Sequence, residues 1–179
     1  MDKQGGIANQ QGKTLEQVVI STFQQKGFQP IPFAKWKDHP DYYGDELLLT
    51  NVPYETIYGH QGKTEFKLSS KRYGEYRIEC KWQQSSGSVD EKFPYLYLNC
   101  IEKMPEPNII IIVDGQGAKP GAVDWLKQAV QAKLYTNETT RMKNIQVLSL
   151  AEFVIWANQT FRGLSPAPMV HPGTNQPLF

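Results

Sequence analysis

The β-branched run from Asn108 to Val113 constrains the fold more than any other stretch of the sequence. It reads Asn-Ile-Ile-Ile-Ile-Val and shows no alternation of apolar and polar residues. A short unbroken apolar run is typical of a strand that is buried on both faces of a sheet. The run therefore predicts an α/β fold with helices on both sides of a sheet, and 179 residues are enough for one such domain.

Four segments begin with a helix start signal and continue with apolar residues at helical spacing. They start at Thr14, Ser88, Pro120 and Ser149. Three of them open with a capping box, namely Thr14–Gln17, Ser88–Glu91 and Ser149–Glu152. Gly27 should end the first helix, and Pro94 should kink the second or delay its regular part by a turn.

Strand periodicity predicts a hairpin over residues 63–68 and 76–83, in which one face is apolar and the other is charged. Before the hairpin, residues 30–46 carry three prolines without clear periodicity, so we expect an irregular segment there. Pro53 should interrupt the strand signal over residues 47–58, because proline cannot donate to a sheet ladder. A last short strand is expected at residues 145–148.

The composition predicts a cytoplasmic globular protein with flexible ends. Hydrophobic residues make up 40% and charged residues 21% of the chain, values that exclude a disordered or collagen-like protein. No apolar run is long enough to cross a membrane, and Cys80 and Cys100 lack the spacing of a disulfide framework or a zinc site. We expect one domain over residues 11–163, with flexible segments at 1–10 and 164–179.

Charge is balanced over the whole chain but uneven along it. The 19 basic and 18 acidic residues exclude a broadly basic surface of the kind that coats nucleic acid. Between Lys63 and Lys81, however, six basic residues stand against three acids. We expect this local excess to make the hairpin surface positive.

The polar face of the hairpin carries residues suited to bind a divalent cation. Strand alternation places Glu79, Lys81 and Gln83 on one face, and hairpin pairing can bring Glu65 beside them. Paired carboxylates on rigid strands suit Mg²⁺, which keeps several waters in its coordination sphere. A nearby lysine could position or deprotonate a water, or neutralise charge that develops on a phosphate.

Simpler interpretations of these side chains stay open from the residues alone. Glu79 and Lys81 could form a solvated strand face with cross-strand ion pairs. Glu16 could be an acid favoured near the start of a helix, and Gln83 could be a polar strand end. The three histidines lie outside this group of residues, so a metal site built on imidazole has little support.

At these residues the chain resembles the PD-(D/E)XK nuclease superfamily, which has the restriction-endonuclease-like fold. The family's residues fall on Glu79 and Lys81 for the (D/E)-x-K motif, Glu65 for the preceding acid, Glu16 for the glutamate of the first helix and Gln83 for a glutamine beyond the lysine. Thr64-Glu65 stands where the family has Pro-Asp. The resemblance covers residues 11 to about 161.

The resemblance implies a fold and a set of roles for these residues. The fold would be an α/β restriction-endonuclease-like αβββαβ core, with a mixed central sheet flanked by helices. The function would be that of a metal-dependent deoxyribonuclease, an endonuclease of the restriction, repair, phage or mobile-element type. Glu65, Glu79, the Cys80 carbonyl and Glu16 would hold or support Mg²⁺, for which Mn²⁺ can substitute, and Lys81 would orient the attacking water.

Three further residues are candidates for contacts to a DNA substrate, namely Lys67, Lys92 and Tyr95. The expected helix that carries Lys92 and Tyr95 also carries Tyr97, which we interpret as a core residue. A homodimer would supply two sites for cutting both strands. The alternatives are a nucleic-acid-binding module that no longer cuts, or a nuclease subunit of a larger complex.

Overall fold

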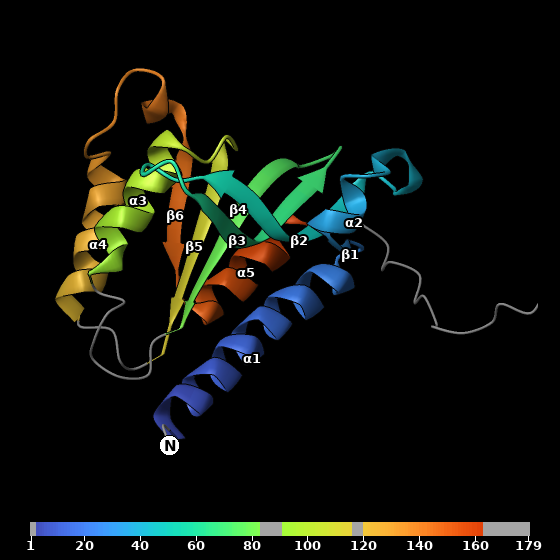
Figure 1. Ribbon diagram of the computed structural model, residues 1–179, viewed down its shortest axis with the longest axis horizontal. Helices are drawn as coiled ribbons and strands as arrows, with labels where there is room; N and C mark the ends of the chain where they lie inside the picture. Colours follow the sequence, from blue (N-terminus) through green and yellow to red (C-terminus); the bar gives the residue numbers. More distant parts are fainter. Residues whose placement is uncertain (1–2, 83–90, 116–119, 163–179) are drawn as a thin grey trace, which may run out of the picture.

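The computed structural model describes residues 3–82, 91–115 and 120–162 (Figure 1). Its regular elements are α1 (Lys3–Gln25), β1 (Gln29–Pro32), α2 (Phe33–Trp36), η1 (Pro40–Tyr42), β2 (Glu46–Glu55), β3 (Gln61–Ser70), β4 (Gly74–Trp82), α3 (Lys92–Glu102), β5 (Asn108–Asp114), α4 (Pro120–Ala132), η2 (Thr140–Met142), β6 (Asn144–Leu148) and α5 (Leu150–Thr160).

One mixed sheet organises the fold. Its six strands lie in the order β1-β2-β3-β4-β5-β6. β2, β3 and β4 form an antiparallel meander, whereas β1 joins β2, β5 joins β4 and β6 joins β5 in parallel. Helices α3 and α4 cover one face of the sheet, and α1 and α5 cover the other (Figure 1). The predicted α/β fold with a mixed sheet between helices is confirmed.

The isoleucine run forms β5, as predicted, and its side chains alternate between two cores. Ile110 and Ile112 pack toward α1 and α5 with Phe23 and Phe153. Ile109 and Ile111 pack toward α3 and α4 in a second core. All four isoleucines are fully buried, so β5 is held between the two cores. β4 pairs with β5 from Tyr76 to Trp82, and this pairing positions β4 in turn.

The first helix starts earlier than its capping signal indicated. Since α1 begins at Lys3, Thr14 lies inside the helix and residues 3–10, expected to be flexible, continue it; the predicted start at Thr14 is wrong. The stretch before Thr14 contains no proline, so no backbone donor is missing from the helix there, although Gly5, Gly6 and Gly12 lower its helix propensity. The predicted end holds, because Gly27 has a φ of 92°, in the left-handed region that glycine favours.

Two predictions based on proline are wrong. The segment 30–46 is not wholly irregular, since it contains most of β1, which pairs with the first half of β2. The second strand is not interrupted at Pro53, because β2 runs from Glu46 to Glu55 and pairs there with β3. Both departures have one cause, since proline is tolerated where a strand has no neighbour on one side. β1 is an edge strand of the sheet, and Pro53 lies beyond the part of β2 that pairs with β1.

Helices α4 and α5 begin at their predicted start signals, Pro120 and Ser149, whereas α3 begins at Lys92, four residues after Ser88. Pro94 is the third residue of α3, in the first turn where no intrahelical N–H bond is required. The capping box at Ser149 forms, with the Glu152 N–H donating to Ser149 Oγ at 3.2 Å and the Ser149 N–H donating to Glu152 Oε2 at 2.7 Å. Two segments named in the predictions lie outside the described residues, namely 83–90 and 164–179. The first contains Gln83 and most of the predicted capping box at Ser88. No helix in the described ranges is long and apolar enough to cross a membrane.

Candidate active site

Glu65 lies where β3 and β4 separate. The two strands pair from Ser70 and Gly74 as far as Phe66 and Ile78, and beyond this point β3 pairs with β2 while β4 pairs with β5. In the gap, the Cys80 backbone N–H donates a hydrogen bond of 2.8 Å to Glu65 Oε2. The Glu65 carboxylate thus accepts a hydrogen bond that a backbone carbonyl would accept in a regular ladder. This hydrogen bond holds Glu65 against β4.

The strand on the other side of Glu65 is also distorted there. Asn51 of β2 has a φ of 55°, a left-handed conformation that is uncommon outside glycine. The ladder between β2 and β3 has pairs at Thr50 and Val52 but none at Asn51, the position opposite Glu65. An open groove borders Glu65 at this point, and its lining includes Glu16 and Lys63. The carboxylate of Glu65 can therefore be approached from outside the sheet.

Glu79 and Lys81 form a buried ion pair on β4. Lys81 Nζ donates to Glu79 Oε1, while Glu79 Oε2 is buried and has no hydrogen-bond partner in the described part of the chain. Glu79 is 4% exposed and the Lys81 side chain 24%. This burial rules out the interpretation of the two residues as a solvated strand face.

The charges of this group shift one another's proton affinities. Burial raises the pKa of Glu79 above its ordinary value; the Lys81 ammonium opposes this change and the Glu65 carboxylate adds to it. Burial alone would lower the pKa of Lys81, but the carboxylates of Glu79 and Glu65 outweigh it and raise the pKa above its ordinary value. Lys81 therefore keeps its proton at neutral pH and acts as a cation rather than as a base.

Glu16 reaches the same region from α1. Its side chain is half-buried and lines the groove beside Glu65. Burial raises the pKa of Glu16, and the Glu65 carboxylate raises it further. Carboxyl groups from a helix and two strands thus lie near Lys81.

The remaining predicted residues lie in different surroundings. Cys80 offers its backbone N–H to Glu65, while its side chain lies in the core between α1 and the sheet. Lys92 is exposed at the start of α3, and Tyr95, one turn later, stacks on a tyrosine of the β2–β3 turn. Tyr97 is buried, as predicted. Lys67 is not brought to the site, because it pairs with Glu75 and Glu106.

Comparison with protein families agrees with this arrangement. A family model described as a PD-(D/E)XK nuclease superfamily domain matches residues 7–161, most of the chain. The chain belongs to the PD-(D/E)XK nuclease superfamily. No curated protein and no solved structure gives a significant match.

The donors of this PD-(D/E)XK domain suit a divalent cation, on which members of the superfamily typically depend. Glu79 Oε2 is a buried carboxylate oxygen without a donor, and Glu65 supplies a second carboxylate close by. The described residues contain no cluster of three or more His, Cys, Asp or Glu side chains placed to hold a metal. Mg²⁺ is commonly bound by one or two carboxylates, while water or backbone oxygens fill its other coordination positions.

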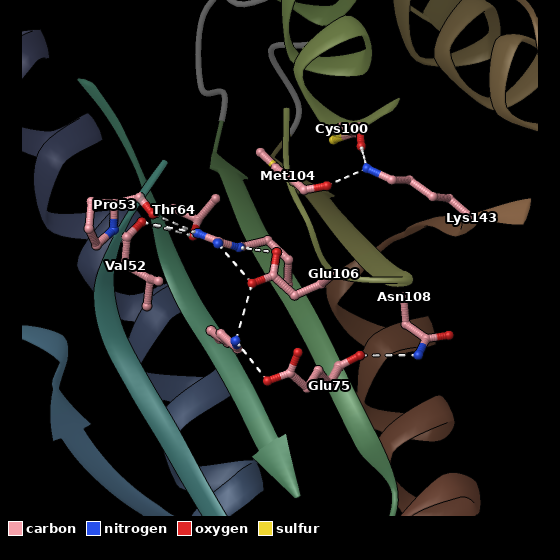
Figure 2. A network of polar contacts seen from close by, with 11 residues as sticks. Val52, Pro53, Thr64, Glu75, Cys100, Met104, Glu106, Asn108 and Lys143 are labelled. Atoms are coloured by element: carbon pink, nitrogen blue, oxygen red, sulfur yellow. Dashed lines mark hydrogen bonds and ion pairs between the residues drawn. The ribbon is translucent and has the colours of Figure 1, made fainter. Parts of the chain in front are cut away.

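A second buried network fixes the strands of the PD-(D/E)XK domain behind the site (Figure 2). Arg77, two residues before Glu79 on β4, donates from Nε and Nη2 to the two carboxylate oxygens of Glu106, each at 2.8 Å. Its Nη1 donates to Thr64 Oγ1 at 3.0 Å and to the Val52 carbonyl at 3.2 Å. One guanidinium thus ties β2, β3 and β4 to the segment between α3 and β5.

Sequence reasoning missed this network. Strand alternation does place Arg77 on the face of Glu79, but its partner Glu106 stands between two prolines in a segment without periodicity. The network also changes the expected surface charge. Four of the six basic hairpin residues pair with carboxylates, namely Lys67, Lys71, Arg77 and Lys81. The local excess of positive charge is therefore largely compensated and does not form an open basic surface.

The lowered pKa of Glu106 predicts a loss of stability in acid. Burial would raise this pKa, but the hydrogen bonds and charge of Arg77 outweigh burial and hold it below the ordinary 4.5. A carboxyl with a lowered folded-state pKa stabilises the fold above its unfolded pKa, and the contribution is lost as the pH falls through the folded value. Thermal melts should therefore show wild type losing its advantage over Glu106→Gln as the pH falls from just above 4.5 through the lowered pKa of Glu106. An advantage that stays constant over this range would contradict the assignment.

Proposed function

We propose that this protein is a metal-dependent nuclease that hydrolyses phosphodiester bonds in DNA, acting as an endonuclease. Membership of the PD-(D/E)XK superfamily gives the reaction class. The observation that supports the proposal most is the buried Glu79–Lys81 pair beside Glu65, in which one oxygen of the Glu79 carboxylate has no hydrogen-bond partner in the described part of the chain. Burying such charges costs stability, so a role in chemistry explains their presence better than a role in folding does.

Each residue of the group has a distinct task in this proposal. Glu65 and Glu79, with the Cys80 carbonyl that the family implies, would hold Mg²⁺ or Mn²⁺, and Glu16 would support them from the groove. A cation bound there supplies Lewis acidity toward the phosphate and makes a water more acidic. Lys81, which keeps its proton, orients the attacking water and stabilises the negative charge that grows on the phosphate oxygens.

The bond changes follow the usual outcome for this superfamily. A water oxygen attacks phosphorus in line with the 3′ oxygen, the new P–O bond forms and the P–O3′ bond breaks. The attacking water releases one proton to bulk water and the departing 3′ oxygen takes one up, while the second proton of the attacking water is carried by the 5′-phosphate and ionises from it to solvent. The products are a 5′-phosphate and a 3′-hydroxyl. End-labelling of the cut strand checks this assignment, and a 3′-phosphate product would contradict it.

Mg²⁺ should stabilise the folded protein through the same carboxylates. Because Glu65 and Glu79 repel each other, a cation bound between them should raise the melting temperature, by an amount equivalent to about 2.7 kcal/mol at a concentration 100 times the dissociation constant. Differential scanning fluorimetry with increasing MgCl₂ measures the shift. In Glu79→Gln the shift should disappear.

Glu75→Gln is the matched control for this experiment. Glu75 lies on the same strand, with its side chain 48% exposed and paired with Lys67. The control should keep the full Mg²⁺ shift. Equal shifts in wild type and Glu79→Gln would mean that the ion binds elsewhere.

A further inference from the structure

Two tyrosines from separate elements stack at the surface on the active-site end of the sheet. Tyr58 lies in the turn between β2 and β3, and Tyr95 lies in the first part of α3. Their ring centroids are 5.0 Å apart and their planes differ by 24°. Tyr58 is 68% exposed, and His60 approaches its ring edge-on. The pair presents aromatic surface to solvent.

The turn that carries Tyr58 is held firmly against α3. The Ile57 N–H donates to Asn99 Oδ1 at 2.9 Å, and Asn99 Nδ2 donates to the Tyr95 carbonyl at 2.8 Å. One buried asparagine of α3 therefore anchors the backbone beside both tyrosines. The Thr56 N–H also closes the turn with a 2.8 Å bond to the His60 carbonyl. A ligand that stacks on Tyr58 would find the ring already in place, which lowers the entropic cost of binding.

The turn that carries Tyr58 is joined to the strand that carries Glu65. The turn leads directly into β3, and the five steps along the chain from His60 to Glu65 span about 17 Å in an extended strand. On this path the ring of Tyr54 packs over Gly62, where a Cβ would come within 2.8 Å of it. A distance of about 17 Å corresponds to about five stacked nucleotides of one strand.

Charge near the pair suits a nucleic acid strand. Lys92 is exposed on α3 and stands three residues before Tyr95, so the two side chains lie on the same side of the helix. Lys63 is exposed at the other side of the turn and lines the groove beside Glu65. Aromatic rings flanked by cations are the usual means by which proteins hold single strands without reading their sequence.

We propose that Tyr58, stacked on Tyr95, binds an unpaired base of the substrate strand, so that the enzyme prefers single-stranded or branched DNA to an intact duplex. This inference rests on the proposed nuclease function. A base inside a duplex is stacked on both sides, so only an unpaired or terminal base can lie on the tyrosine ring. The preference should not depend on base sequence, because every base has a flat aromatic face.

Binding without catalysis tests the inference. A fluorescent single-stranded oligonucleotide and a blunt duplex of the same sequence are titrated in EDTA, and anisotropy is measured. Tyr58→Ala should lower single-strand affinity by about tenfold and leave duplex affinity within about twofold, whereas Tyr58→Phe should bind as wild type does.

Tyr42→Ala is the matched control. Tyr42 is 80% exposed and stacks on His39 near the start of β2, at the opposite end of the sheet. Its removal should change neither affinity. If Tyr58→Ala binds single strands as tightly as wild type, or loses duplex and single-strand binding equally, the stacking role is wrong.

Cleavage assays separate this failure from failure of the proposed function. A wild type that cuts DNA in Mg²⁺ while Tyr58→Ala keeps full single-strand affinity overturns the stacking role alone. A wild type that neither binds nor cuts DNA overturns both. A wild type that binds single strands through Tyr58 but cuts nothing supports the stacking role and overturns the nuclease activity.

Discussion

Replacing Lys81 by alanine is expected to slow Mg²⁺-dependent DNA cleavage by about 100-fold to about 1,000-fold, the usual cost of removing one preorganised electrostatic group. The loss follows because Lys81 is a cation beside the two carboxylates that would hold the metal, where negative charge grows on the phosphate in the proposed reaction. Because the ammonium group contacts Glu79, its removal also leaves that carboxylate buried without a counter-ion. Initial rates on a labelled DNA substrate measure the effect.

Lys71→Ala provides the control for general loss of positive charge. Lys71 lies beyond the other end of β3, with its side chain 80% exposed and paired with Asp45. It should cleave at the wild-type rate. If both lysine variants are slowed equally, Lys81 contributes only to the general charge of the surface, and the proposed role in catalysis is wrong.

Glu106→Gln is expected to lower the free energy of unfolding by about 3–5 kcal/mol, because it leaves the buried Arg77 guanidinium without its counter-ion. Both side chains are almost completely buried, at 3% and 1% exposure. The substitution keeps the shape of the side chain, so the loss reflects charge rather than packing. Urea unfolding followed by circular dichroism measures it.

The Lys103–Glu55 pair supplies the comparison. It has a similar distance, 3.0 Å, but Glu55 is 68% exposed. Glu55→Gln should cost no more than about 1 kcal/mol, as exposed ion pairs do. If the two variants lose similar amounts of unfolding free energy, burial does not increase the contribution of the Arg77–Glu106 pair to stability.

The sequence predicts the parts of this protein that follow from local periodicity. The isoleucine run identifies β5 and its burial on both faces, because burial on two sides leaves no place for polar residues. Alternation along β4 correctly puts Glu79 and Lys81 on one face, where the structure brings them into contact. Catalytic roles for these residues remain proposals.

The features that sequence reasoning missed depend on partners far apart in the chain. β1 is stabilised by pairing with β2, so a segment with three prolines between residues 30 and 46 still forms a strand at its start. Arg77 and Glu106 are 29 residues apart, and Tyr58 meets Tyr95 across two elements. No spacing rule connects such residues, because their proximity follows from the packing of the whole sheet.

Metal-dependent cleavage by the wild-type protein tests the central claim most directly. Supercoiled plasmid, linear duplex, branched DNA and single-stranded DNA are incubated with the protein in MgCl₂, MnCl₂ or EDTA, beside Glu79→Gln. We expect cleavage with either metal, none in EDTA and none by the variant, with single-stranded or branched DNA cut fastest. Absence of cleavage of every substrate in both metals, by a protein that still binds DNA, would contradict the account and identify a binding module that has lost its activity.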